Sequence, residues 1–253
     1  MSDVAKDKWA ALRQATPARI ALGRSGAGLP TRANLEFQFA HARARDAVHS
    51  GLDLDALEAE LAPLEVIRVA SAAPDRASYL RRPDLGRKLA EGEAEKLNAR
   101  PVCDVAFVIA DGLSSAAVQA HAAAVTHAAR ARLEGLSLGP VVIASQARVA
   151  IGDEIGAASG ARLVVLLVGE RPGLTVADSL GAYLTYDPKP GTKDSQRNCL
   201  SNIHGQGGMS YEQAAGKIAW LTRAALERKL TGTGLKEESG ALDVENAPLI
   251  DGA

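Results

Sequence analysis

The chain has 253 residues, of which 47% are hydrophobic, and its 29 basic residues nearly balance 30 acidic ones, leaving a formal charge of −1. A nearly neutral chain lacks the basic surface with which proteins bind nucleic acid or anionic membranes. Aromatic residues make up only 4% of the chain, too few for a stacking platform on single-stranded nucleic acid. We therefore expect a globular protein that binds neither nucleic acid nor membrane.

The sequence predicts a protein of the cytoplasm. No apolar run approaches the roughly 20 residues of a membrane helix, and the opening stretch MSDVAKDKWAALRQ lacks the apolar centre of a secretion signal. Two cysteines, Cys103 and Cys199, are too few for a disulfide framework. We expect both thiols to be reduced.

Residues 1–100 are predicted to form a small, mostly helical region. One helix is expected to begin at a Thr31 cap, with an apolar stripe formed by Leu35, Phe39, Ala42 and Val48. The glycine-rich GRSGAG at 23–28 matches neither phosphate-binding pattern, so a chain reversal is the better interpretation. Further expected elements are helices over 54–60 and 87–97 and an edge strand over 66–71.

Residues 101–230 alternate between strands and helices, and residues 231–253 are predicted to be a flexible tail. The run from Leu163 to Val168 is apolar on both faces, which is typical of a strand buried in a parallel sheet. The predicted fold is therefore α/β, with a Rossmann-like parallel sheet wound by helices. The other strands are expected over 105–110, 141–144 and 182–186, with helix caps at Ser114 or Ser115 and at Ser210.

Charged residues follow the most apolar strand directly, in the turn Gly169-Glu170-Arg171-Pro172-Gly173. Ligands of open α/β sheets bind beyond the carboxyl ends of the strands. Glu170 and Arg171 are therefore the ion pair best placed for function. Asp111, at the end of another expected strand, faces the same edge of the sheet as Glu170, and a plain strand-to-helix turn with a helix cap is the alternative interpretation.

Cys199 and His204 invite two interpretations. A thiol nucleophile with its base is one, but proximity along the chain is weak support and no third orienting group is identifiable. A structural or ligand-lining role is favoured. Two distant cysteines and one histidine do not form a zinc pattern, so no metal site is expected.

Six blocks in order give the sequence a family resemblance. FVIADGLSSAAV at 107–118, RVAIGDEIG at 148–156, LLVGERPGL at 166–174 and CLSNIHGQGG at 199–208 together resemble the small subunit of ethanolamine ammonia-lyase. LGRSGAGLPT at 22–31 and YLRRPDLGRKL at 79–89 resemble the same family. The resemblance covers residues 17–230.

The resemblance implies a radical ammonia-lyase that converts ethanolamine to acetaldehyde and ammonia with adenosylcobalamin. A TIM-barrel large subunit would hold ethanolamine and the reacting groups, several large–small pairs would assemble, and cobalamin would lie between the two subunits. The family's cobalamin contacts carry over to Val149, Glu170 and Cys199, with Arg171, Asn202 and His204 as neighbours. No catalytic residue is expected on this chain, because the cofactor supplies the hard chemistry.

The sequence also differs from some relatives. The Asp-x-His-x-x-Gly pattern of base-off cobalamin proteins does not occur, which agrees with a benzimidazole that stays on cobalt. Only Met1 to Thr16 precedes the matched region, whereas some relatives carry a long leader for packaging into a bacterial microcompartment. Two alternative functions stay open: a self-sufficient α/β enzyme that uses Cys199 and His204, and a non-catalytic adaptor that binds another protein.

Overall fold

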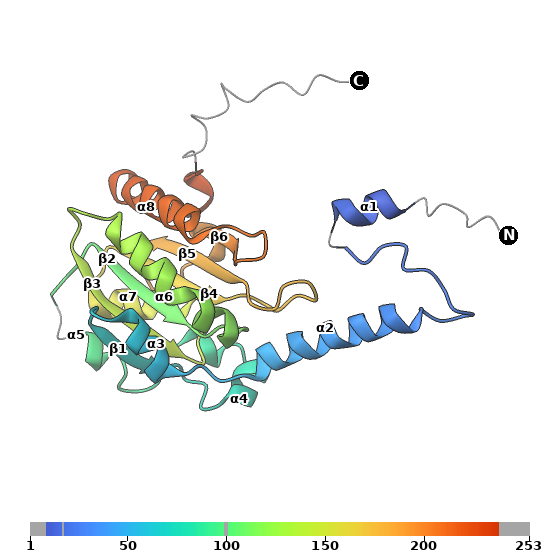
Figure 1. Cartoon of the computed structure of the whole chain (residues 1–253). Coiled ribbons are helices and arrows are strands. Elements are labelled where there is room, and N and C mark those ends of the chain that lie inside the picture. The colour runs from blue at the N-terminus through green and yellow to red at the C-terminus, as the bar shows by residue number, and fades with distance from the viewer. Residues whose placement is uncertain (1–8, 17, 99–100, 238–253) are drawn as a thin grey trace, which may run out of the picture.

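A computed structural model of the chain describes residues 9–16, 18–98 and 101–237. A body built on one sheet carries a projecting arm, defined as residues 9–16 and 18–49 (Figure 1). The elements in chain order are α1 (Ala10–Ala15), α2 (Thr31–His49), α3 (Leu54–Leu61), β1 (Val66–Ala70), α4 (Arg76–Arg81), η1 (Leu85–Arg87), α5 (Glu95–Asn98), β2 (Val105–Ala110), α6 (Ser115–Ala131), β3 (Leu138–Ser145), α7 (Ile151–Ser159), β4 (Leu163–Gly169), β5 (Leu180–Tyr186), η2 (Asp194–Gln196), β6 (Asn198–Ile203), α8 (Tyr211–Arg228) and η3 (Gly232–Gly234).

The six strands form one mixed sheet in the order β1-β3-β2-β4-β5-β6. Strands β1 to β4 are parallel, whereas β5 is antiparallel to β4 and to β6. The predicted parallel sheet is correct for the first four strands and wrong for β5, and β6 was not predicted as a strand. The connection from Gly169 to Leu180 contains no helix, and a parallel neighbour needs a crossover of a dozen or more residues, usually a helix.

Helices cover both faces of the sheet. One core lies between the sheet and α3, α6 and α8, and a second core lies between the sheet and α5 and α7 (Figure 1). Every residue of β2 and β4 is buried. The unbroken apolar pattern from Leu163 therefore reflects a strand covered on both sides, as the sequence predicted.

Side-chain caps begin the two long helices of the body. Ser114 accepts a hydrogen bond from Ala117 N at the start of α6, and Ser210 and Gln213 form a capping box at the start of α8. Both predicted starts are confirmed. Each cap satisfies a backbone N–H group that the first helical turn leaves without a partner.

The helix predicted over 87–97 is wrong for most of its length. Only 95–98 are helical there, because Ala72 N donates to Lys88 O and Ala90 N donates to Ala70 O. The segment thus pairs with the end of β1, and tertiary pairing outweighs a moderate helix propensity.

The arm departs from its predicted packing. Thr31 is the first helical residue of α2 rather than its cap, and Pro30 at the cap position supplies no side-chain hydrogen bond. Leu35 and Phe39 are 58% and 67% exposed. Within α2 only Ala40 and Ala47 are buried.

The sheet crosses the domain boundary that the sequence predicted at residue 100. Strand β1 lies before residue 100 and belongs to the same sheet as the later strands. The boundary at residue 100 stays a prediction. Of the predicted tail, Leu235 is buried against the body, and residues 238–253 lie outside the described residues.

Candidate functional site

The candidate site lies beyond the carboxyl ends of β2, β3 and β4. The chain leaves β2 for α6 on one face of the sheet and leaves β3 for α7 on the other face. Where neighbouring strands send their connections to opposite faces, a ligand-binding crevice opens. A cavity of about 280 Å³ occupies this position and is lined by residues that follow all three strands, among them Leu113, Val149, Glu170 and Arg171.

Two glycines allow the turns after β2 and β4 to approach closely. Gly112 has a φ of +59°, and a Cβ at this position would overlap the carbonyl oxygen of Gly169. A Cβ at Gly169 would in turn overlap the carbonyl oxygen of Ser114. Leu113 N donates to Gly169 O at 2.9 Å. A side chain at either glycine would therefore separate the turns and displace Glu170.

Asp111 ties the same edge to the turn after β3. Its two carboxylate oxygens accept hydrogen bonds from Gln146 N at 2.9 Å and Ala147 N at 2.8 Å. Arg76 Nη1 lies 3.6 Å from the carboxylate and donates to Gly112 O at 2.8 Å. Burial raises the pKa of Asp111, although these hydrogen bonds oppose the change. Of the two interpretations of Asp111, the structure favours a place at the edge shared with Glu170 over a plain turn, because its carboxylate holds the turns after β2 and β3 together.

Tyr79 of α4 forms a buried part of the cavity wall. The guanidinium carbons of Arg76 and Arg148 lie 4.6 Å and 4.5 Å from the centroid of its ring. Burial raises the pKa of Tyr79 to about 12, so the phenol is neutral at physiological pH. The two cations are therefore held by the face of the ring and not by a phenolate.

The two carboxylate oxygens of Glu170 differ in the hydrogen bonds that they accept. Ser179 Oγ donates to Oε2 at 2.5 Å, and Asn202 N donates to the same oxygen at 3.3 Å. Within 9–16, 18–98 and 101–237, no group donates to Oε1. A half-buried carboxylate oxygen in this state is a ready acceptor for an N–H group of a ligand.

Tyr183 of β5 links the other two predicted contacts. Its side chain lines the cavity together with Val149. It lies opposite Cys199 in the pairing of β5 with β6, and burial, followed by the neighbouring thiol, raises the pKa of its phenol. The structure thus places Val149, Glu170 and Cys199 around one tyrosine.

Comparisons with known proteins agree on one family. Residues 6–236 match the profile of the ethanolamine ammonia-lyase light chain, EutC. The chain is 56% identical over 236 residues to the ethanolamine ammonia-lyase small subunit of Bradyrhizobium diazoefficiens, covering 90% of each chain. It is 51% identical over 243 residues to the small subunit of Xanthomonas campestris pv. campestris, covering 92% of this chain and 89% of the relative.

The chain belongs to the ethanolamine ammonia-lyase light-chain family. A third relative, the small subunit of Rhodopseudomonas palustris, is 53% identical over 234 residues and is covered to 89%. The predicted resemblance is confirmed. The name of each relative is that of a lyase subunit, and a small subunit implies a larger one.

Within this family member, Cys199 and His204 do not form a nucleophile and base. His204 Nδ1 accepts from Gln206 N at 3.1 Å, which leaves Nε2 to donate to Asn202 Oδ1 at 2.7 Å. Desolvation raises the pKa of the Cys199 thiol, and the Glu170 carboxylate acts in the same direction. A neutral thiol opposite Tyr183 is suited to lining a site rather than to attack.

The remaining predicted neighbours of the site have distinct places. Arg171 lines the cavity and is exposed, whereas Asn202 contributes its backbone N–H to Glu170. In the part of the chain that the structure describes, no cluster of three or more His, Cys, Asp or Glu side chains is arranged to hold a metal ion. No helix of that part is long and apolar enough to cross a membrane.

Sequence reasoning missed Tyr79, Arg148 and Tyr183. Arg148 stands directly before Val149 in a block that the resemblance singled out, so its place was within reach. Tyr183 carried no local signal, because it sits in an apolar strand and meets Cys199 only through the pairing of β5 with β6.

Proposed function

We propose that this chain is the small subunit of an adenosylcobalamin-dependent ethanolamine ammonia-lyase and helps to bind cobalamin at the interface with a TIM-barrel large subunit. The observation that carries the proposal is the convergence of Val149, Glu170 and Cys199 around Tyr183 at one edge of the sheet. The large subunit would hold ethanolamine and the reacting groups. This chain would contribute no catalytic residue.

The chemistry of the three residues fits the cofactor. The corrin ring carries a fringe of primary amides, and Glu170 Oε1 is an acceptor without a donor among the described residues. Val149 offers an apolar contact, and the neutral Cys199 thiol packs without an isolated charge. Gly181 supports this arrangement, because a Cβ there would lie 3.0 Å from Oε1 and crowd the acceptor.

When bound, adenosylcobalamin supplies the radical that removes hydrogen from the substrate. The residues of this chain would position the corrin and keep water from one of its edges. Ser179 and Asn202 hold Oε2 of Glu170, so that Oε1 keeps a fixed direction. Asp111 and the paired glycines keep the three strand ends together.

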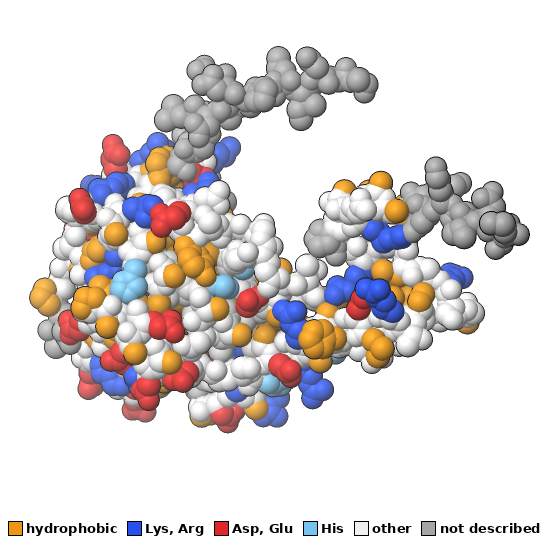
Figure 2. Space-filling view, in the orientation of Figure 1, with side chains coloured by type: hydrophobic (Ala, Val, Ile, Leu, Met, Phe, Trp, Pro, Cys, Tyr) orange, Lys and Arg blue, Asp and Glu red, His pale blue; other side chains and the backbone are white. Residues whose placement is uncertain are grey.

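The positive charge of the arm favours a protein partner with a negatively charged surface. Six arginines against Glu36 and Asp46 give residues 9–49 a formal charge of +4, in a chain whose total is −1. Figure 2 shows basic and hydrophobic side chains gathered on this arm. Arg19 Nη2 donates to Leu174 O at 3.2 Å, which joins the arm to the loop after Glu170. We therefore assign the arm to the large subunit, on an acidic surface continuous with the cofactor edge.

Glu170→Ala in the reconstituted complex tests the cofactor contact. We expect the dissociation constant for adenosylcobalamin to rise about tenfold, the scale of one hydrogen bond to a charged group, while turnover at saturating cofactor is largely kept. Glu170→Gln retains an amide oxygen and should weaken binding less. Exposed Glu227→Ala removes a carboxylate elsewhere and serves as the control. An unchanged dissociation constant for Glu170→Ala would remove this residue from the proposed site.

A further inference from the structure

A second, larger cavity adjoins the candidate site. It has a volume of about 690 Å³ and lies between η1, the start of α7 and the loop before η2. It shares Arg148, Val149 and Tyr183 with the site cavity. A ligand bound at the candidate site would therefore have room to extend into it.

The cavity is lined by more available positive than negative charge. Its cations are Arg87, Lys88, Arg148 and Lys193, and we call it the basic cavity. No carboxylate of the described residues forms an ion pair with any of the four. Arg148 Nε is buried and has no hydrogen-bond partner within the described ranges. A buried donor of a charged group without an acceptor is costly, so the protein itself leaves part of the Arg148 guanidinium uncompensated.

Three carboxylates also line the basic cavity, and their recorded contacts are with groups other than its four cations. Asp153 accepts two hydrogen bonds from Arg197, at 2.6 Å and 2.8 Å, and both side chains are 2% exposed. Glu154 accepts from Leu89 N at 2.7 Å, and Asp194 lies 3.5 Å from Arg197. The cations of the cavity are thus left to an anion from outside.

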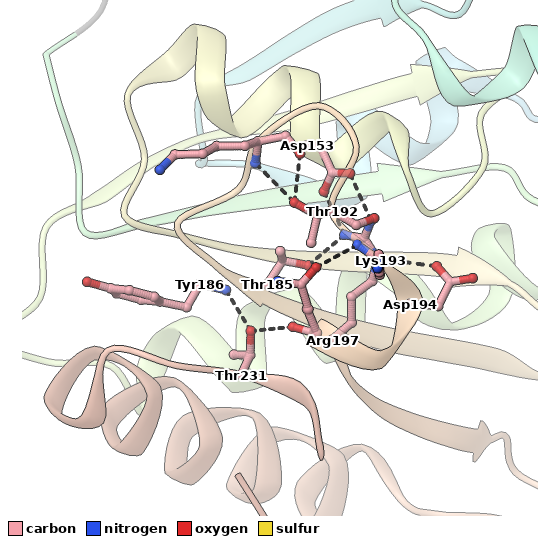
Figure 3. Close-up of polar contacts among 10 residues, drawn as sticks. Asp153, Thr185, Tyr186, Thr192, Lys193, Asp194, Arg197 and Thr231 are labelled. Carbon is pink, nitrogen blue, oxygen red and sulfur yellow. Dashed lines mark hydrogen bonds and ion pairs between the residues drawn. The ribbon is translucent and has the colours of Figure 1, made fainter. Parts of the chain in front are cut away.

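Arg197 also makes one wall of the basic cavity rigid. It donates to Thr185 Oγ1 on β5 and to Thr192 O in the loop, as well as to Asp153 on α7 (Figure 3). The loop that carries Lys193 is therefore fixed to the helix on the opposite wall.

We infer that the basic cavity binds a phosphodiester, namely the one in the nucleotide tail of the corrinoid at the candidate site. This inference rests on the proposed function. The periphery of the corrin is made of neutral amides, and the phosphodiester is the anionic group of the cofactor. The shared residues Arg148, Val149 and Tyr183 connect the corrin edge to the cations.

The test compares two corrinoids on the reconstituted complex. Cyanocobalamin carries the nucleotide tail, whereas the matching cobinamide lacks it, and the absorbance change on titration gives each dissociation constant. For Arg87→Gln with Lys193→Gln we expect cobalamin to bind about tenfold more weakly and cobinamide to bind unchanged. The cobalamin effect should shrink at high salt, because salt screens exposed charges.

Controls separate the possible failures. Exposed Lys236→Gln removes a positive charge outside the cavity and should change neither constant. Equal weakening of cobalamin and cobinamide, or no weakening of either, would overturn the phosphodiester assignment. So would tight binding of inorganic phosphate to the wild-type complex without competition from cobalamin, since the cavity would then serve a free anion.

The wild-type chain tests the proposed function itself, through the corrinoid affinity of the large subunit with and without this chain. If this chain adds nothing to the affinity of the large subunit for either corrinoid, the proposed function itself fails. If the wild-type complex binds both corrinoids and the cavity variants leave both dissociation constants unchanged, the proposed function stands and the cavity assignment alone fails.

Discussion

In the body, every residue of β2 and β4 is buried between two helical layers, whereas α2 of the arm leaves Leu35 and Phe39 at 58% and 67% exposed. Both regions contain apolar residues at regular spacing. In the body that spacing meets an opposing surface of the same chain, whereas in α2 only Ala40 and Ala47 are buried. An apolar pattern therefore predicts that a surface is buried, but not whether the same chain or a partner buries it.

The largest expected effect separates the two regions by stability. Phe107→Ala removes a side chain with no exposed area from β2, and we expect the free energy of unfolding to fall by about 3–5 kcal/mol. Phe39→Ala in the arm should change it by less than about 0.5 kcal/mol in the isolated chain. Urea unfolding measures both. Similar losses for the two variants would break the comparison.

The buried ion pair of the body should give the next effect. Asp153→Ala leaves the Arg197 guanidinium buried without its carboxylate, which costs about 3 kcal/mol of unfolding free energy. Replacing both residues by apolar ones, Asp153→Leu with Arg197→Met, should recover part of that loss. If urea denaturation of Asp153→Ala matches the wild type, the pair does not hold the loop before β6.

The arm should matter for assembly instead. Phe37→Ala with Phe39→Ala is expected to weaken binding to the large subunit by about 2 kcal/mol, because exposed aromatic side chains are frequent interface anchors. Val102→Ala, at a body residue that is 72% exposed, is the matched control. Titration calorimetry with the large subunit measures the change. Equal affinities of the arm variant and the control would disprove the docking role.

The smallest effect concerns thiol reactivity. Because the pKa of Cys199 is raised, its alkylation at neutral pH should be slower than that of a small model thiol, by less than about tenfold, and should accelerate as the pH rises. Tyr183→Phe removes the phenol hydroxyl, which acts to lower this pKa, so alkylation should slow further. Iodoacetamide labelling followed by mass spectrometry gives the rates. Rapid labelling at neutral pH would revive the nucleophile.

The elements that sequence predicted well have local signals. The apolar run of β4 and the Ser210 capping box each depend on neighbouring residues alone. Strand β6 escaped prediction because Cys199, Ser201 and Asn202 are exposed along it, so no apolar alternation remained. Its place comes from antiparallel pairing with β5.

The candidate site divides in the same way. Glu170 was marked by its position after a buried strand, and the family resemblance supplied Val149 and Cys199. Pairs distant in sequence, such as Asp153 with Arg197, were beyond local reasoning, because only the tertiary fold brings them together.

We propose that cobalamin is held jointly by this chain and a larger subunit. The most direct measurement is a titration of adenosylcobalamin in the dark, followed by absorbance, with this chain alone, the large subunit alone and their mixture. We expect weak binding by each subunit alone and much tighter binding by the mixture. Equal affinity of the large subunit with and without this chain would contradict it.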